Sequence, residues 1–359
     1  MAILDLTRLA RTPLARSAAP ALLAAVMLPA AAVAETAIHF TLDRKIDGPA
    51  APFFLAIDKG YFKAEGLDVT IDAPAAGTAA STTGPAGAAA PAEPISRLAT
   101  GTHDMGVADL NGLIKFRDDN PAVPIKALFV VFDKPPYAII ARKSRGIAAP
   151  KDLEGKKLGA AAADASFAQW PIFTKVNGVD AAKVLVETVG LPVREPMLAA
   201  GEVDAITGCS FTSYVDLKAD SVPADDLAVL AMADYGVELY GDAIMAAPKF
   251  LTEKPAAARA FLRAYLRALK DTLRDPAHAV EAVLRRNDAA KKDVELERLR
   301  LAIRDNIVTP AVKANGFGGI DPGRFAAAIN QLALAYRFKA KDKAVEAFDP
   351  SFLPGGAEQ

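Results

Sequence analysis

The chain has 359 residues, of which 52% are hydrophobic and 24% charged, and its 42 basic side chains nearly balance 43 acidic ones. This length suits two domains, and the even charge without a dense basic tract argues against a nucleic-acid-binding protein. Because Cys209 is the single cysteine, a fold of this size must be held together by its core rather than by disulfides. We interpret Cys209 as a small buried residue and not as a reactive thiol.

The first 34 residues have the features of a secretory signal peptide. Three arginines precede an alanine-rich apolar stretch, and Ala32–Ala34 offers a small-residue cleavage site before Glu35. We therefore predict a cleaved signal peptide over residues 1–34, with an uncleaved anchor as the alternative. No cysteine follows the apolar stretch, which argues against a lipoprotein.

Strand-like segments alternate with helical patterns as far as Ala247. In Phe54–Ile71, a helical run ends at Gly60 and an alternating, half-buried strand follows from Leu67. This alternation favours an α/β protein in which parallel sheets are covered by helices. The expected strands lie in the segments 37–43, 67–72, 104–109, 125–132, 137–142, 156–161, 183–189, 203–208, 227–233 and 241–247.

One short pattern occurs twice in this part of the chain. Leu98–Asp104 and Leu198–Asp204 each predict the end of a helix, a glycine stop and an aspartate before a strand. The repeat suggests two lobes, in which Asp109–Gly112 and Cys209–Ser213 hold equivalent places after a strand. Ligands of open α/β sheets bind outside the carboxyl ends of strands, so two such edges that face each other would form a cleft.

From Pro248 onward the pattern becomes helical. Apolar residues recur at helical spacing over Leu262–Leu273, Leu296–Ile303 and Phe325–Tyr336, as expected of amphipathic helices. Ala73–Pro94 is rich in alanine, glycine and proline, and we interpret it as a surface insertion, with a functional lid as the alternative.

Motifs of catalysis and metal binding are absent from the sequence. There is no nucleophile elbow, no phosphate-binding loop and no dinucleotide fingerprint. The three histidines, His39, His103 and His278, have no partners at ligand spacing. The sequence therefore predicts no enzyme, no metal site and no cofactor.

Candidate ligand-binding residues follow the expected strands. Phe53 or Phe54 lies at the carboxyl edge of the first strand, with a core position as the equal alternative. Asp109 and Asn111 lie where a strand ends and a helix begins, so we expect at least one of them to cap that helix.

The second half of the chain repeats this arrangement. We expect Asp164 or Ser166 to cap a helix, inside which Trp170 is either an aromatic wall of the pocket or plain packing. Ser210 and Phe211 follow the strand of the repeated unit, in the equivalent place.

Arg194 and Glu195 precede Pro196 in what the sequence predicts as the first turn of a helix. A glutamate suits that positive end, whereas an arginine does not. Arg194 would then face an anion, supplied by a ligand or by Glu195 itself. A solvated arginine is the alternative.

Several of these segments resemble a known family. Pro52–Ile71 and Ile95–Asp109 resemble periplasmic substrate-binding proteins of ABC importers, in the group for nitrate, sulfonates, taurine and thiamine-pyrimidine precursors. Ala149–Asp164 and Leu198–Gly208 fit the pattern of that group in its second lobe. The resemblance covers most of the chain after residue 34.

This resemblance implies a type II periplasmic-binding-protein fold, with two α/β lobes, a hinge of two crossover strands and a helical C-terminal region. Lobe 1 would comprise residues 35–141 plus 241–359, and lobe 2 residues 142–240. The expected function is a monomeric periplasmic receptor that closes on a small ligand and delivers it to a permease and an ATPase in the inner membrane.

The ligand and two other functions stay open. Arg194 argues for an anion and Glu195 for an amine, so sulfonate-like, taurine-like, nitrate-like and aminopyrimidine-like compounds all fit. A sensor or partner-docking protein on the same fold is the second hypothesis. An exported enzyme is the third, with Glu195 or Asp109 as its acid or base. The resemblance argues against a yeast-type pyrimidine synthase, which uses a cysteine-rich motif where this chain has Cys209 alone.

Overall fold

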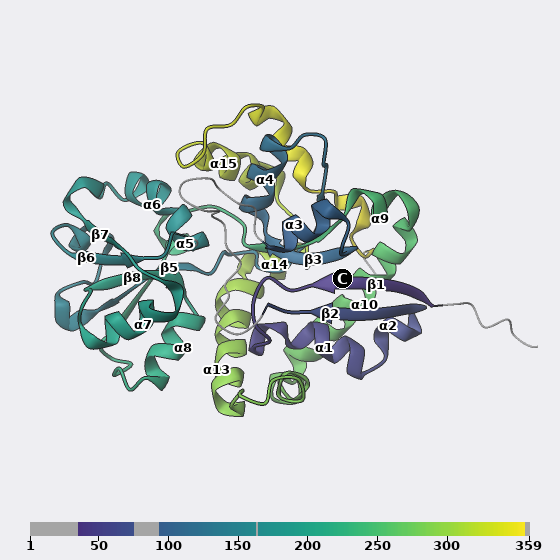
Figure 1. Cartoon of the computed structure of the whole chain (residues 1–359), viewed down its shortest axis with the longest axis horizontal. Coiled ribbons are helices and arrows are strands. Elements are labelled where there is room, and N and C mark those ends of the chain that lie inside the picture. The colour runs from purple at the N-terminus through teal and green to yellow at the C-terminus, as the bar shows by residue number, and fades with distance from the viewer. Residues whose placement is uncertain (1–34, 75–92, 163, 356–359) are drawn as a thin grey trace, which may run out of the picture. The chain divides into compact units, whose positions relative to one another are not determined.

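In the computed structural model the described residues are 35–74, 93–162 and 164–355, and they carry two five-stranded sheets (Figure 1). The predicted signal peptide lies outside the described residues, as does the Ala73–Pro94 stretch from residue 75 to residue 92. No helix in the described ranges is both long enough and apolar enough to cross a membrane.

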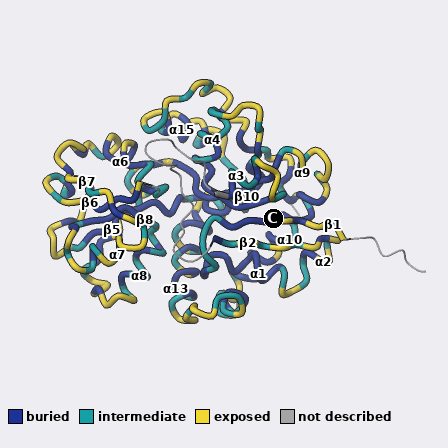
Figure 2. Tube along the Cα trace, in the orientation of Figure 1, coloured by how far each residue is buried: buried dark blue, intermediate teal, exposed yellow. Residues whose placement is uncertain are grey.

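The first sheet has the strand order β2-β1-β3-β10-β4. Strands β1, β2 and β3 are parallel, whereas β10 is antiparallel to both β3 and β4. Strands β3 and β10 are buried along their whole length, so they form the centre of this half (Figure 2). The bounds are β1 (Thr36–Thr41), β2 (Leu67–Asp72), β3 (Met105–Asp109), β4 (Lys126–Val130) and β10 (Asp242–Ala246).

The second sheet has the order β7-β6-β8-β5-β9. It repeats the first: β6, β7 and β8 are parallel, and β5 is antiparallel to both β8 and β9. The bounds are β5 (Tyr137–Arg142), β6 (Lys157–Ala160), β7 (Leu185–Thr188), β8 (Ala205–Cys209) and β9 (Leu227–Ala231).

The prediction of parallel sheets is therefore wrong for one strand in each sheet, β10 in the first and β5 in the second. Strand β5 is the first that the chain enters after leaving the first sheet, and β10 is the first on its return. Apolar runs show that a strand is buried on both faces but carry no information about its direction. The lobe boundaries stay a prediction.

The repeated sequence pattern has the same structure at both places. Helices α3 (Glu93–Thr100) and α7 (Leu191–Ala200) end at glycines with φ values of 73° and 76°. Asp104 Oδ2 then accepts a hydrogen bond of 2.8 Å from the backbone N–H of His39, and Asp204 Oδ2 one of 2.9 Å from that of Lys157. Each aspartate thus ties the start of a strand to its neighbour, which explains why the pattern occurs before β3 and β8.

Helices α1 (Ala51–Asp58) and α10 (Pro255–Arg274) pack together beside the first sheet. Their contact is aromatic: the ring centroid of Phe53 lies 5.1 Å from that of Phe40 and 4.5 Å from that of Tyr265. The apolar stripe predicted over Leu262–Leu273 accordingly lies in α10.

The remaining elements complete the chain between these strands and helices. They are η1 (Gly48–Ala50), α2 (Tyr61–Ala64), α4 (Leu110–Asp119), η3 (Lys143–Arg145), η4 (Pro150–Leu153), α5 (Ala165–Ala168), α6 (Trp170–Val176), η5 (Ala181–Lys183), α8 (Thr212–Ala219), η6 (Met232–Tyr235), α9 (Pro248–Glu253), α11 (Pro276–Ala279), α12 (Glu281–Leu284), α13 (Lys292–Ala302), the π-helix η7 (Ile303–Ile307), α14 (Pro310–Asn315), α15 (Pro322–Leu332), η8 (Lys341–Ala347) and η9 (Pro350–Phe352).

Candidate functional site

Polar side chains of the first sheet meet where β3 ends and β10 begins. Asp109 and Asp242 are direct partners in the antiparallel register of these two strands. The hydroxyl of Tyr137, the first residue of β5, donates to Asp109 Oδ2. Asn111 Nδ2 in turn donates to the Tyr137 oxygen at 2.9 Å and to the Tyr240 carbonyl oxygen at 2.7 Å. Residues of both sheets thus share one hydrogen-bond network.

Asp109 also caps helix α4, as the sequence predicts. Its Oδ1 accepts hydrogen bonds from the backbone N–H groups of Asn111, at 2.6 Å, and Gly112, at 3.1 Å. Burial raises the pKa of Asp109 above its usual value, and the hydrogen bonds from Tyr137 and the helix oppose that rise. The carboxylate of Asp109 is therefore fixed in place by its donors.

Arg44, just beyond the end of β1, is the cation of this region. Its Nε and Nη2 donate to Asp43 at 3.1 and 2.8 Å, and Nη2 also donates to Asp242. The guanidinium carbon lies 5.4 Å from the ring centroid of Phe132 and 5.9 Å from that of Phe211. Phe211 follows β8, so Arg44 contacts a residue of the second sheet.

We call this group the inter-sheet cluster. It consists of Asp43, Arg44, Asp109, Asn111, Phe132, Tyr137, Phe211 and Asp242. The Arg44 side chain is 24% exposed and that of Asp43 13%, so the cluster is reachable at one edge. Burial, with Asp43 beside it, raises the pKa of Asp242 well above its usual value.

A second polar network lies within the second sheet and its helices. Arg194 Nη1 donates to Asp164 Oδ2 at 2.9 Å, and Nη2 donates to Glu195 Oε1 at 2.6 Å. Thr207 and Ser213 donate to the same two carboxylates at 2.7 Å each. Arg194 is only 7% exposed, so it is a buried residue that two carboxylates neutralise.

The start of helix α7 differs from the sequence prediction. The helix begins at Leu191 with Pro192 in its first turn, so Arg194 and Pro196 lie further inside it. The expected cap in this half is present: Asp164 accepts a 3.0 Å hydrogen bond from the backbone N–H of Ser166. The Ser166 hydroxyl donates to the Gly208 carbonyl oxygen at 2.7 Å, which ties α5 to β8.

Three other predicted site residues are buried in packing contacts, whereas Ser210 adjoins the inter-sheet cluster, because its backbone N–H donates to the Pro136 carbonyl oxygen at 2.8 Å, next to Tyr137. Phe53 is in the aromatic core with Phe40 and Tyr265, and Phe54 is buried with the Arg286 guanidinium carbon 4.9 Å from its ring centroid. Trp170 is 6% exposed and stacks on Phe173 with 6.0 Å between centroids. Ser210 lines a groove of about 610 Å³ between β9 and the α13–η7 segment.

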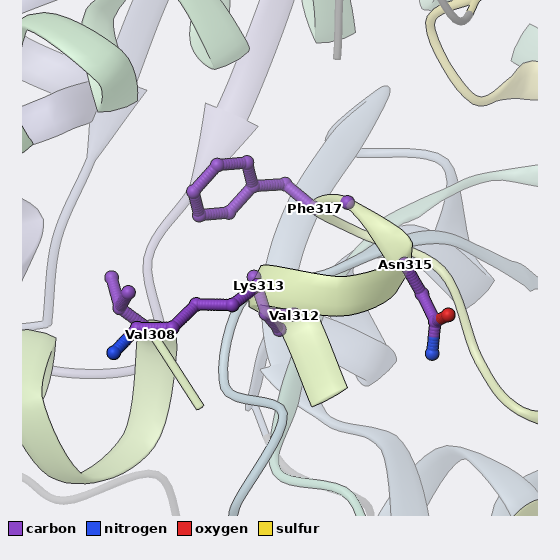
Figure 3. Close-up of a pocket in the computed structure, with 6 residues that line it drawn as sticks. Val308, Val312, Lys313, Asn315 and Phe317 are labelled. Carbon is purple, nitrogen blue, oxygen red and sulfur yellow. The ribbon is translucent and has the colours of Figure 1, made fainter. Parts of the chain in front are cut away.

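A smaller hollow lies at the end of α14 (Figure 3). It measures about 480 Å³ and is lined by Val308, Val312, Lys313, Asn315, Gly316 and Phe317. None of the predicted site residues is among these. Among the described residues, no three His, Cys, Asp or Glu side chains come together as a metal site.

Five members of the inter-sheet cluster were not predicted: Asp43, Arg44, Phe132, Tyr137 and Asp242. Asp43 and Phe132 end the expected strands 37–43 and 125–132, and Arg44 directly follows the first of these. Tyr137 begins the expected strand 137–142, and Asp242 is the second residue of 241–247. A charged or hydroxyl side chain at the end or start of an expected strand could have indicated these residues, apart from Phe132, as site candidates. Arg44 lies in the charged run Asp43–Asp47, whose composition does not distinguish a buried ion pair from a solvated loop.

Residues 49–279 match the family described as NMT1/THI5 like. The chain belongs to the NMT1/THI5-like family. That match spans α1, both sheets apart from β1, and most of the inter-sheet cluster. The resemblance found in the sequence is thereby confirmed at the level of the family.

Curated relatives include binding proteins and enzymes. The riboflavin-binding protein RibY of Chloroflexus aurantiacus is 24% identical over 314 residues, which is 86% of this chain and 83% of the relative. A 4-amino-5-hydroxymethyl-2-methylpyrimidine phosphate synthase of Aspergillus parasiticus is 26% identical over 240 residues, or 64% of this chain and 65% of the relative. Membership of the NMT1/THI5-like family alone therefore does not decide between binding and catalysis.

Solved structures share the fold. The periplasmic aliphatic sulphonate binding protein SsuA of Escherichia coli aligns with a TM-score of 0.63 and 13% identity, covering 83% of this chain and 91% of SsuA. This NMT1/THI5-like chain has the type II periplasmic-binding-protein fold, as the sequence predicts.

Proposed function

We propose that this protein is the periplasmic substrate-binding component of an ABC importer and that its ligand binds at the inter-sheet cluster. The cluster combines aromatic rings with a few fixed polar groups, the usual composition of a small-molecule site. Both sheets contribute to it through Tyr137 and Phe211 on one side and Arg44 and Asp242 on the other. A ligand held there would favour the closed arrangement of the two halves.

We choose the proposed ligand class from the ion pairs that the two arginines make. Arg44 is paired with Asp43 and Asp242, and Arg194 with Asp164 and Glu195. A sulfonate or nitrate would need a cation that is not already neutralised. The cluster holds three aspartates against the single cation Arg44, so carboxylate acceptors are in excess. This excess suits a planar nitrogen heterocycle that presents N–H donors, such as an aminopyrimidine, with Phe132 or Phe211 beside its ring.

We further propose that the two halves move as lobes. The predicted bounds, 35–141 plus 241–359 for lobe 1 and 142–240 for lobe 2, are kept except at residue 141. Because β5 (Tyr137–Arg142) pairs with β8 and β9, we place β5 in lobe 2, so that the chain crosses between β4 and β5 and again between β9 and β10. The protein would act as a monomer, with a permease and an ATPase as partners. A sensor that docks on a membrane receptor would use the same motion and is the alternative.

Our proposal excludes catalysis, although some relatives are named as synthases. Cys209 is the single cysteine of the chain and, contrary to the sequence prediction of a buried residue, it is only partly buried. Burial raises the pKa of its thiol, which disfavours the reactive thiolate. Incubation with a bound heterocycle, followed by mass spectrometry, should return the compound unchanged. Turnover that is lost in Asp109→Asn would contradict this part of the proposal.

A thermal-shift panel tests the proposed ligand class. Ligands that bind only the folded state raise the unfolding midpoint by mass action. We expect 4-amino-5-hydroxymethyl-2-methylpyrimidine or riboflavin to raise the midpoint, and taurine, methanesulfonate and nitrate to leave it unchanged. A shift with a sulfonate and none with any heterocycle would contradict the ligand class. A flat panel would favour the sensor alternative.

A further inference from the structure

Helix α13 joins the two halves of the protein outside the inter-sheet cluster. The side chain of Arg298 is only 2% exposed. Its Nη2 donates to Asp216 Oδ1 of α8 at 2.5 Å, and its Nη1 donates to Glu295 within α13. Helix α8 follows β8 of the second sheet, so this guanidinium links a C-terminal helix to the second sheet.

The same helix also holds the loop that carries Arg44. Glu295 Oε2 accepts a hydrogen bond of 2.7 Å from the backbone N–H of Gly48. The loop lies so close that a Cβ on Gly48 would be 2.2 Å from the Glu295 carbonyl oxygen. The loop after β1 therefore cannot shift without moving α13.

These contacts make a continuous path around the ligand site. Arg44 and Gly48 belong to one loop, and Phe211 directly precedes the helix that carries Asp216. Within the inter-sheet cluster, the Arg44 guanidinium lies over the ring of Phe211. Outside the cluster, Glu295 accepts from Gly48 and is paired with Arg298, which in turn donates to Asp216. Arg44 and Phe211 are thus connected to Arg298 through Gly48 and Asp216, respectively.

Arg298 also has a third carboxylate close to it, besides those of Asp216 and Glu295. Asp47 is 1% exposed, and its charge helps to raise the pKa of Arg298, against the effect of burial. Asp47 Oδ1 and Arg298 Nε have no hydrogen-bond partner among the described residues. If Asp216 moved away, Arg298 would stay paired with Glu295 and have Asp47 nearby, so its buried charge would not be left uncompensated, which would be strongly destabilising.

We propose that Arg298 is an inter-sheet latch, which holds α8 against α13 in the ligand-free protein and so regulates access to the proposed ligand site. This regulatory role builds on the proposed function, but the latch itself can be tested without a ligand. A second inter-sheet ion pair, Lys218 with Glu297, joins the same helices. Both of its side chains are about one-third exposed, whereas in the Arg298–Asp216 pair only Asp216 is, at 36%, and Arg298 is 2% exposed. Exposed pairs contribute little to stability, so Arg298 carries the latch.

Small-angle X-ray scattering on refolded, ligand-free protein tests the latch. Asp216→Asn removes the inter-sheet arm and leaves the Arg298–Glu295 pair in place. Asp220→Asn is the matched control, because it makes the same charge change at the exposed end of α8. We expect wild type and Asp220→Asn to share one radius of gyration that agrees with the described structure, and Asp216→Asn to have a larger one.

Arg298→Lys provides a second variant in case Asp216→Asn lowers stability. Lysine keeps the charge but lacks the forked guanidinium group that can bind two carboxylates at once. We therefore expect Arg298→Lys to have a larger radius of gyration, as Asp216→Asn should. Equal radii for the wild type and both latch variants would overturn the latch, as would a wild type that is already expanded without ligand. Failure of the ligand panel with an intact latch effect would instead count against the proposed function alone.

Discussion

Asp109 and Asp242 lie directly opposite each other on β3 and β10, and both carboxylates are buried. Each is held by a different partner: Asp109 accepts from the Tyr137 hydroxyl, and Asp242 accepts from Arg44. Two buried carboxylates in one cross-strand pair are unfavourable unless each is compensated. The Tyr137 hydroxyl and the Arg44 guanidinium therefore compensate the two carboxylates and allow both to stay buried in the first sheet.

Asp242→Asn should weaken binding of a nitrogen heterocycle at least tenfold, because one charged acceptor of its N–H groups is lost. Isothermal titration calorimetry measures this change. Asp68→Asn is the control, since Asp68 is exposed on β2. Equal affinities of the two variants would place the ligand elsewhere.

Tyr137→Phe should lower the free energy of unfolding by about 1–3 kcal/mol, since buried Asp109 and Asn111 each lose a partner. Urea denaturation measures the loss. Tyr235→Phe, on the partly buried Tyr235 of η6, serves as the control for removing a hydroxyl and should have a smaller effect. An unchanged midpoint for Tyr137→Phe would show that the hydroxyl does not contribute to stability.

Asp47 should make the protein less stable as the pH rises from about 4 to above 6. Burial raises the pKa of Asp47 to about 6, against the opposing effect of Arg44 and Arg298. The raised pKa means that the folded state binds more protons than the unfolded state in this range, so the free energy of unfolding falls with rising pH, by up to about 3 kcal/mol.

The Asp47→Asn variant provides the measurement. Its free energy of unfolding at pH 7 should exceed that of the wild type, and its pH dependence between 4 and 7 should be flatter. Asp234→Asn, at an exposed carboxylate of η6, is the control. A wild-type curve that rises between pH 4 and 7, and that Asp47→Asn leaves unchanged, would contradict the assignment.

Phe53→Ala should lower the free energy of unfolding by about 3–5 kcal/mol, because it leaves a cavity between Phe40 and Tyr265. Ligand affinity of the folded fraction should stay as in the wild type. Phe53→Leu should lose less stability, since it fills part of the cavity. Loss of affinity in Phe53→Leu without loss of stability would mean that Phe53 contacts the ligand.

The sequence was sufficient to predict the strands and the repeated helix-to-strand unit, because both depend on local signals. Apolar alternation identifies each strand, and the glycine and aspartate of Leu98–Asp104 and Leu198–Asp204 mark a helix end and a strand start. The helix cap at Asp109 could be predicted for the same reason.

Strand direction and most of the candidate site could not be predicted in this way. Strands β5 and β10 are antiparallel only because the chain crosses between sheets before each of them. Arg44 and Asp242 are 198 positions apart, and their pairing depends on the strand order. The sequence predicted that Arg194 faces a ligand or Glu195, and it does pair with Glu195. Its second partner, Asp164, lies 30 positions earlier at the cap of another helix, so this contact could not be predicted from the local sequence.

Native mass spectrometry of protein purified from its own host tests the central claim most directly. We predict a one-to-one complex, the released ligand having the mass and ultraviolet absorption of a nitrogen heterocycle and returning unchanged after incubation. Asp242→Asn purified in the same way should carry less of it. A wild-type protein that carries a sulfonate, or that converts its ligand to a product, would contradict the account.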